Sequence, residues 1–214
     1  MLIIDAHKAV VERERGSAMV EFTLAAGLFL VPLLLGTMVI GQNLIREIET
    51  TQVCRDAGHM YAYGVDFSQA ANQNLLVDIG QGLNLQTSGG EGVVILSTVT
   101  YIGPNDCTAG GYQANSSSCA NLNQTVFTRR IVIGNSSIQS SAFGTPNSSL
   151  MDSSGNISQA GYLNNTSTRA TNFSNLIPLT SGQYAFMSEM YVATPDLSVW
   201  SFLGTTGVSA RSIF

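Results

Sequence analysis

The stretch Gly16-Ser17-Ala18-Met19-Val20-Glu21-Phe22, with the apolar run that follows it to Ile40, decides how this chain is organised. A short charged segment, residues 1–16, precedes it, and no Asp, Glu, Lys or Arg occurs between Phe22 and Ile45. A helix over residues 22–45 would be about 36 Å long, which suffices for a hydrocarbon core of about 30 Å. The sequence therefore predicts a membrane-spanning helix with one carboxylate, Glu21, near its start.

Two other interpretations of the apolar run fit less well. A buried core helix is rarely apolar on every side over such a length. A cleaved secretory signal has a hydrophobic region of about 7–15 residues and a small-x-small cleavage site. The run here is longer, and Gly36-Thr37-Met38-Val39 matches such a site poorly. Because Lys8, Arg13 and Arg15 precede the run, we expect the amino terminus in the cytoplasm.

The helix is expected to continue beyond the membrane as an amphipathic segment that ends at Gly64. The residues proposed for its packing face recur at spacings of three and four: Leu44, Ile48, Thr51, Cys54, Gly58 and Tyr61. The predicted domain organisation is a cytoplasmic leader at 1–16, a helix at 17–63 and an extracytoplasmic domain at 64–214.

Pro32 lies inside the apolar run and is predicted to kink the helix, because proline lacks a backbone donor and clashes with the carbonyl four residues earlier. In a membrane helix such a break is tolerated where neighbours satisfy the carbonyl. A static kink and a loosening that serves assembly both remain open.

The part after the helix has the composition of a small α+β domain. A short helix capped by Ser68 is predicted to end near Gly80, with Leu75, Leu76 and Ile79 facing inward. Three segments have strand composition and turn-rich flanks, namely residues 93–102, 126–133 and 183–192, and the first two are expected to pair antiparallel. A Ser/Asn/Gly-rich segment, about 135–181, is either a surface excursion or contains short strands near 142–143 and 172–179, and the tail from 197 to 214 is expected to hold a last helical turn and strand.

Cys107 and Cys119 flank a short polar segment, and in an exported domain this spacing favours a disulfide. Such a bond would stabilise the fold by about 3 kcal/mol by restricting the unfolded chain. A zinc site would need CxxC-type pairs accompanied by histidines, and the sequence has no such combination. Cys54 lies on the predicted helix, where a small packed residue is the simplest interpretation and an intermolecular partner is the alternative.

The composition argues against nucleic-acid binding and against catalysis. The 214-residue chain has a net charge of -5, only 11% of its residues are charged, and no basic stripe is present to neutralise phosphates. His59 is the one histidine after the leader, so no Ser-His-Asp or Cys-His set can be assembled. The segment from Asp152 to Asn156 is only faintly similar to a calcium loop and lacks the acidic ligands of an EF-hand. We expect no enzyme activity, no cofactor and no metal.

The segment Arg15-Gly16-Ser17-Ala18-Met19-Val20-Glu21-Phe22 closely resembles the start of TadE-like proteins, which are minor pilins or pseudopilins of the tight-adherence (Tad) pilus system. The family pattern is a basic residue, Gly, small residues, Glu-Phe and a leucine-rich run. Phe22 stands where the related major pilin usually has Tyr, which favours the minor subunit, and the large domain after the helix points the same way. The close match covers about 30 residues, and the remainder resembles the family more loosely.

The resemblance implies a structural subunit that a prepilin peptidase trims between Gly16 and Ser17. It also implies that Glu21 and Phe22 act in assembly, with the new Ser17 amine pairing with Glu21 of a neighbouring helix. The implied partners are the peptidase, inner-membrane lipid and other pilin subunits, and the implied destination is a pilus at the cell surface. The alternative is a single-span membrane protein with an external binding or adhesive domain that does not polymerise.

Overall fold

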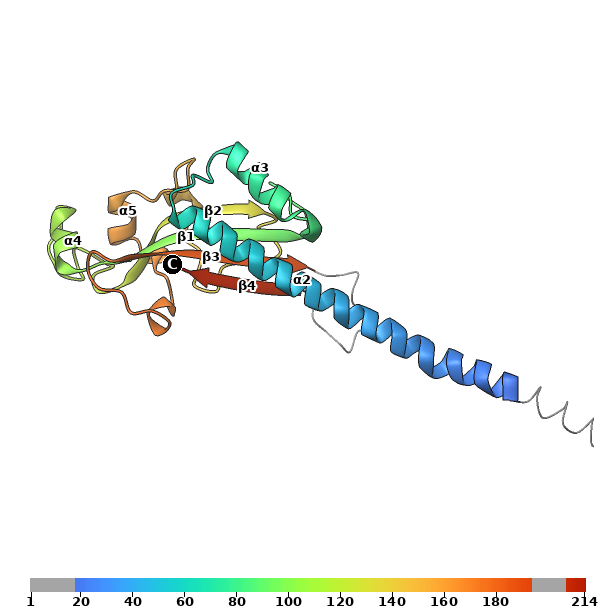
Figure 1. Ribbon diagram of the computed structural model, residues 1–214. Helices are drawn as coiled ribbons and strands as arrows, with labels where there is room; N and C mark the ends of the chain where they lie inside the picture. Colours follow the sequence, from blue (N-terminus) through green and yellow to red (C-terminus); the bar gives the residue numbers. More distant parts are fainter. Residues whose placement is uncertain (1–17, 194–206) are drawn as a thin grey trace, which may run out of the picture. The chain divides into compact units, whose positions relative to one another are not determined.

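A computed structural model of the chain describes residues 18–193 and 207–214 (Figure 1). The chain divides into two units, residues 1–45 and residues 46–214, each with its own internal contacts. The predicted cleavage site at Gly16 and Ser17, and the first part of the predicted tail element, lie outside the described residues. The α+β class is confirmed, because a long apolar helix at the amino-terminal end is combined with a small antiparallel sheet.

The long helix runs over 45 residues from Ala18 to Ala62. It contains one wide turn, the π-helical segment η1 (Ala26–Leu30), and continues as α2 (Val31–Ala62). The end at Gly64 is confirmed: its φ is +89°, and the Val65 N–H donates to the carbonyl of Met60 at 2.9 Å. This arrangement satisfies carbonyls that would otherwise lack partners at a helix end, and glycine adopts the required backbone without a steric penalty.

The second unit is built on a four-stranded antiparallel sheet with the strand order β2-β1-β3-β4. The strands are β1 (Gly92–Tyr101), β2 (Thr125–Gly134), β3 (Tyr184–Ala193) and β4 (Gly207–Ile213). The three predicted strands and the antiparallel β1–β2 pair are therefore confirmed, and β4 lies in the predicted tail. The central strand β1 is mostly buried, which accounts for the apolar run at its residues 93–96.

One face of the sheet packs against the second half of α2, residues 46–62 (Figure 1). The helix contributes Val53, Cys54, Ala57 and Tyr61 to this core, and the Tyr61 hydroxyl lies 2.8 Å from that of Thr98 on β1.

Gly58 allows the close approach of this helix and the sheet. A Cβ atom at Gly58 would overlap the ring of Phe214 and would lie 3.1 Å from the Cβ of Ser188. Even an alanine at this position would therefore force a neighbouring side chain to shift.

The packing face of the helix differs in part from the predicted one. Cys54, Gly58 and Tyr61 are buried as predicted, but Ile48 and Thr51 are exposed. Thr50 takes the place of Thr51 in the buried set. Leu44 is also exposed, and it belongs to the first unit. Several sets of helix residues recur at a spacing of three and four, and packing against the sheet determines which of these sets is buried.

The second helix, α3 (Ala70–Ile79), exists as predicted, but its details differ. Gln69 precedes it without a side-chain cap, while the Ser68 hydroxyl bonds to the Asp66 carboxylate instead. Only Leu76 is buried, whereas Leu75 and Ile79 are exposed, so the predicted inward orientation of these two residues is wrong. A short helix that rests on the domain through one buried side chain does not need a wider apolar stripe.

The Ser/Asn/Gly-rich segment covers the other face of the sheet, and the short strands expected near 142–143 and 172–179 are not formed. Its elements are short helices: η3 (Ser148–Leu150), α5 (Gln159–Asn164), η4 (Thr166–Thr168) and η5 (Phe173–Asn175). Phe143, Ile157 and Phe173 pack against Val99 and Phe127 of the sheet. Only a few apolar side chains of the segment pack on the sheet, and most of its other residues are polar. For this reason its composition resembles that of an exposed loop.

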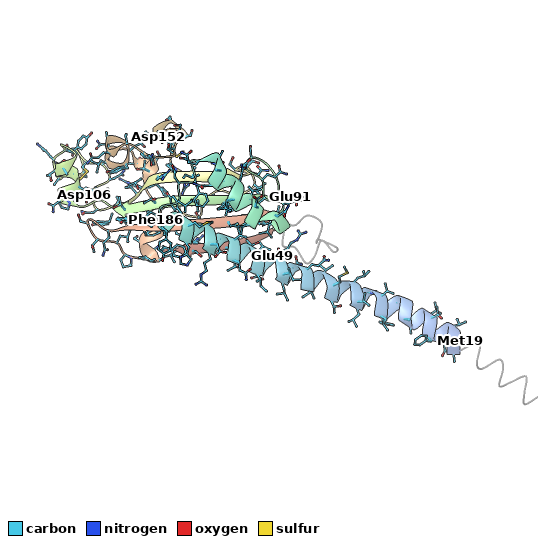
Figure 2. All side chains as sticks on the ribbon, turned by 45° about the horizontal axis from the view of Figure 1, so that its top comes forward. Met19, Glu49, Glu91, Asp106, Asp152 and Phe186 are labelled. Carbon is cyan, nitrogen blue, oxygen red and sulfur yellow. A yellow bond between two sulfur atoms is a disulfide. The ribbon has the colours of Figure 1, made fainter. Side chains whose placement is uncertain are left out.

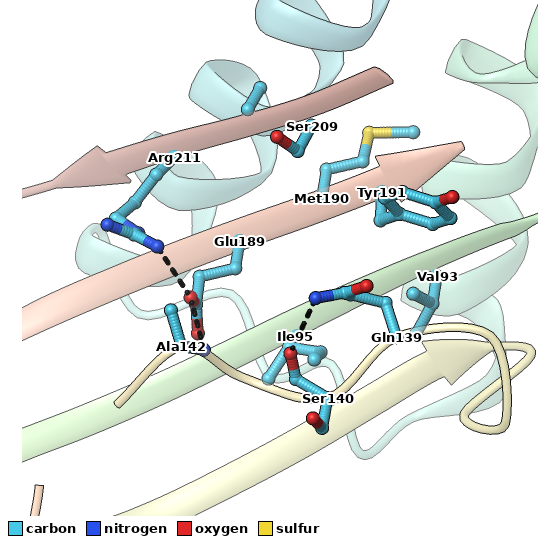
Figure 3. A pocket seen from close by; sticks show the side chains of 11 residues that line it. Val93, Ile95, Gln139, Ser140, Ala142, Glu189, Met190, Tyr191, Ser209 and Arg211 are labelled. Carbon is cyan, nitrogen blue, oxygen red and sulfur yellow. Dashed lines mark hydrogen bonds and ion pairs between the residues drawn. The ribbon is translucent and has the colours of Figure 1, made fainter. Parts of the chain in front are cut away.

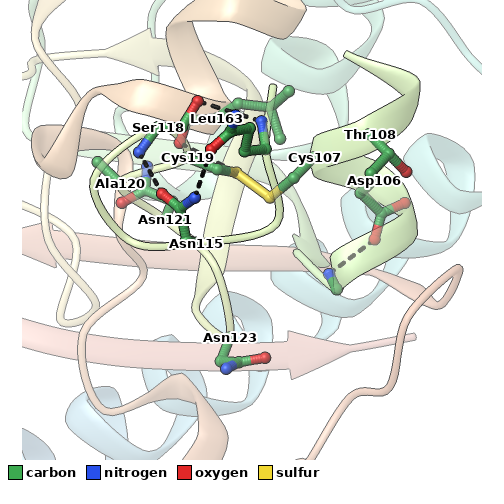
Figure 4. Close-up of a disulfide and its surroundings, with 12 residues drawn as sticks. Asp106, Cys107, Thr108, Asn115, Ser118, Cys119, Ala120, Asn121, Asn123 and Leu163 are labelled. Carbon is green, nitrogen blue, oxygen red and sulfur yellow. Dashed lines mark hydrogen bonds between the residues drawn. A yellow bond between two sulfur atoms is a disulfide. The ribbon is translucent and has the colours of Figure 1, made fainter. Parts of the chain in front are cut away.

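The predicted disulfide between Cys107 and Cys119 is present, with a Cα–Cα distance of 5.9 Å (Figure 4). Cys107 lies in α4 (Pro104–Ala109), a short helix that begins with a proline, and both cysteines are fully buried. The bridge packs with Ile102 and Leu163 in a third small core. Cys54 is an unpaired, buried thiol that donates weakly to the Ser188 carbonyl, which confirms the packed-residue interpretation.

Asp66 is expected to make the stability of the domain depend on pH in acid. Hydrogen bonds from Ser68 and the ion pair with Arg129 lower the pKa of Asp66 from 3.8 to about 2. A lowered folded-state pKa means that the contribution is complete above about pH 4 and is lost as the pH falls towards 2. Because the Asp66 side chain is 43% exposed, we expect no more than about 1 kcal/mol.

Urea unfolding across this pH range measures the effect. The free energy of unfolding of Asp66→Asn should change less with pH than that of the parent chain, whereas Asp78→Asn, at an exposed position, should follow the parent. An unchanged slope for Asp66→Asn would contradict the assignment.

Candidate functional site

The first unit exposes a continuous apolar surface around the helix. Its most apolar stretch of 18 residues contains no buried residue, and Figure 2 shows the side chains projecting outward around this part of the helix. Met19, Phe22 and Phe29 are all at least 70% exposed. An exposed apolar surface of this extent is typical of contact with a membrane or with another protein. By length and composition the helix can cross a membrane, as a membrane anchor or a signal sequence does.

In the described part of the first unit, the hydroxyl groups of Thr23 and Thr37 are satisfied within the helix itself. Thr23 donates to the Met19 carbonyl at 2.8 Å, and Thr37 donates to the Leu34 carbonyl at 2.9 Å. In a hydrocarbon environment an unpaired hydroxyl would cost free energy, because no water is present to replace the bond. Both threonines are therefore compatible with an apolar environment around the helix.

Glu21 stands near the start of the described helix and is exposed. No ion pair or hydrogen bond involves its carboxylate within residues 18–193 and 207–214. The side chain of the adjacent Phe22 is 72% exposed. A carboxylate at this depth in an apolar helix costs a few kcal/mol unless it finds a cation. The assembly roles predicted for Glu21 and Phe22 stay predictions, and Gly16 and Ser17 lie outside the described chain.

The wide turn η1 ends at Leu30, two residues before Pro32. The Val31 N–H donates to the carbonyl of Ala26, five residues back, whereas a regular α-helix would use the carbonyl of Gly27. Turns of this kind occur as single bulges within α-helices, often at functional sites, and they are a recognised cause of helix kinks. The sequence analysis identified Pro32 but missed the π turn. The predicted kink at Pro32 itself remains a prediction.

A cavity of about 290 Å³ lies in the second unit, on the sheet face opposite α2 (Figure 3). Glu189 of β3 lines it. The Glu189 carboxylate accepts hydrogen bonds from the Ser141 hydroxyl and the Ala142 N–H, and it forms an ion pair with Arg211 of β4 at 3.3 Å. These partners occupy both oxygens of Glu189. The carboxylate therefore ties the long segment to the sheet, and it is not poised as a general base.

A second buried charge, Arg130 of β2, lies on the same face. Its guanidinium donates to the Ser97 hydroxyl at 3.1 Å and to the Gly144 carbonyl at 2.7 Å, and it stacks 4.1 Å above the Phe127 ring. Burial lowers the pKa of Arg130 to about 10, and the negative charge of Glu189 opposes this effect. The guanidinium stays charged at neutral pH. Sequence analysis placed Arg130 in a strand but did not predict this polar layer.

The described residues hold no group of three or more His, Cys, Asp or Glu side chains that could bind a metal ion. The Asp152 carboxylate accepts bonds from the backbone N–H groups of Ser154 and Asn156 and from the Asn156 side chain, and these bonds lower its pKa. The faint similarity to a calcium loop is thus accounted for by a self-contained turn.

No protein-family model, curated protein or solved structure matches this chain. The fold and the exposed helix characterise the chain as an α+β domain that carries an apolar helix able to cross a membrane.

Proposed function

We propose that this chain is a pilin-like structural subunit of the TadE-like kind, anchored in the bacterial inner membrane and assembled into or at the tip of a Tad-type pilus. The observation that carries the proposal is the exposed apolar helix with Glu21 near its start. An anchored binding domain needs the apolar helix but has no use for a carboxylate within it. A helix that moves from lipid into a bundle of like helices gives that carboxylate a partner, because packing can bring a cation to it.

Processing would create the required cation. Cleavage by a prepilin peptidase after Gly16 leaves the amine of Ser17 at the end of the mature helix, four residues from Glu21. A separation of four residues corresponds to about one turn of an α-helix, and we propose that in a bundle the amine pairs with Glu21 of a neighbour. The negative side chain near the helix start is also favoured by the helix dipole. The remaining domain, held by its own sheet and disulfide, would face the cell surface.

The mass of the amino-terminal peptide tests the proposal. We expect the chain purified from cells with an active prepilin peptidase to begin at Ser17, and the chain from cells without the peptidase to begin at Met1. An intact leader in both strains would exclude processing and favour the anchored binding protein.

Glu21→Ala provides the second arm of this test. It should be inserted and cleaved normally, because removing a charge eases insertion, yet it should be absent from sheared filaments. Glu47→Ala, at an exposed position beyond the span, is the matched control and should assemble as the parent does. Normal incorporation of Glu21→Ala would contradict the role given to this carboxylate.

A further inference from the structure

A small acidic pocket lies between α2 and the turn η2 (Gln81–Leu83), within the second unit. It has a volume of about 170 Å³, and its lining consists of Glu49, Gln52, Val53, Asp56, Ile79, Gly82 and Leu83. Glu49 and Asp56 are seven residues apart on α2, so they stand two turns apart on one side of the helix. Gly82 leaves room for Glu49, since a Cβ at Gly82 would lie 3.1 Å from its Oε2.

Neither carboxylate of this pocket has a partner within the described chain. No hydrogen bond or ion pair there involves Glu49 or Asp56. The pocket also presents Val53, Leu83 and Ile79, of which the first two are buried and the third is exposed. An apolar base flanked by two carboxylates suits a side chain with an apolar stem and a cationic head. Arginine has both, because its methylene groups pack on apolar surface while its guanidinium binds carboxylates.

The same helix carries an arginine, Arg55, that has no partner among the described residues. Arg55 is exposed and has no hydrogen bond, ion pair or ring contact among the residues that the structure describes. Every other arginine in that part of the chain is engaged: Arg46, Arg129, Arg130, Arg169 and Arg211. Arg55 does not line the pocket of its own chain, and its side chain projects about 100° around the helix from that of Asp56.

We infer that the acidic pocket binds Arg55 of a second copy of this chain. The inference deepens the proposed function and rests on it, since a filament subunit packs against neighbouring subunits and a second copy carries the charge that matches this pocket. Arg55 and the pocket lie on different sides of the same helix. A head-to-tail contact leaves a pocket open on one copy and an arginine open on the other and extends into rings or helical filaments, whereas a reciprocal contact closes as a dimer. The chain has few cationic side chains, so few other residues could occupy the acidic pocket in place of Arg55.

Reversal of the charge at Arg55 tests the inference. We would measure self-association of the full-length chain in a non-ionic detergent by sedimentation, at low and high salt. Arg55→Glu is expected to weaken the association constant at low salt at least about tenfold, because like charges would then meet in the pocket. High salt should weaken association of the parent chain in the same direction. Glu47→Lys, an exposed change on the same helix outside the pocket, is the matched control and should associate as the parent does.

The combined variant Arg55→Glu, Glu49→Lys, Asp56→Lys restores opposite charges between copies and should recover association. Any one of three results would overturn the inference. The combined variant fails to recover association, Arg55→Glu associates as strongly as the parent, or the parent stays monomeric at both salt concentrations. Circular dichroism of every variant confirms folding. The amino-terminal mass, measured on the same samples, reports processing separately, so the pairing of Arg55 can fail while the proposed function stands.

Discussion

Glu189→Ala is expected to destabilise the domain by about 2–3 kcal/mol, because a buried hydroxyl and a backbone N–H would lose a charged hydrogen-bond acceptor. The Glu189 side chain is only 11% exposed. Its loss would leave the Ser141 hydroxyl and the Ala142 N–H without their acceptor, and it would remove the negative charge that faces Arg211. The buried guanidinium of Arg130 would lose the same compensating charge.

Urea unfolding of the full-length chain in a mild detergent measures this effect, with the transition followed by circular dichroism. Glu189→Gln should lie between the parent and Glu189→Ala, because an amide still accepts hydrogen bonds but carries no charge. Glu47→Ala, at an exposed position, should stay within about 0.5 kcal/mol of the parent. A loss below about 1 kcal/mol for Glu189→Ala would contradict this role and would show that the long segment is held to the sheet by its aromatic anchors alone.

Removal of the disulfide, by Cys107→Ala combined with Cys119→Ala, is expected to cost about 3 kcal/mol. The two cysteines are 12 positions apart, and the bond restricts the unfolded chain over that distance. Its removal would also weaken the small core around Ile102 and Leu163, where both cysteines are fully buried.

Thermal unfolding with and without a reducing agent gives the measurement. The parent chain should lose stability on reduction, whereas the double variant should not respond. Cys54→Ala keeps the disulfide and serves as the control, and it should respond to reductant as the parent does. Equal stability of the oxidised and reduced parent would contradict a stabilising role for the bond.

The helix and the three strands β1, β2 and β3 could be predicted because each depends on a pattern within one segment. The apolar run after Phe22, the stop at Gly64 and the β-branched composition of β1 all act over a few neighbouring residues. The disulfide was predictable for the same reason, since two cysteines near each other in an exported domain have few other partners.

The sequence could not predict which face of each helix is buried, nor which residues far apart in the chain pair with each other. The spacing on α2 was compatible with Thr50 or Thr51 facing inward, and packing within the folded domain selected Thr50. Leu75 and Ile79 are exposed although a helical pattern allowed them to face the core. The polar layer under the long segment joins Arg130 to Ser97 and Glu189 to Ser141, pairs that are far apart in the chain.

Hydropathy and charge along one stretch were enough to establish that an apolar helix with Glu21 near its start precedes a separate α+β domain, because both are properties of neighbouring residues. The folded chain was needed to show that Glu49 and Asp56 border a pocket with Leu83, while Arg55 on the same helix lies outside it. The physical reason is that the environment of a helix face depends on what packs beside it. Here η2 and α2, which are separated in the chain by α3, together form that surface.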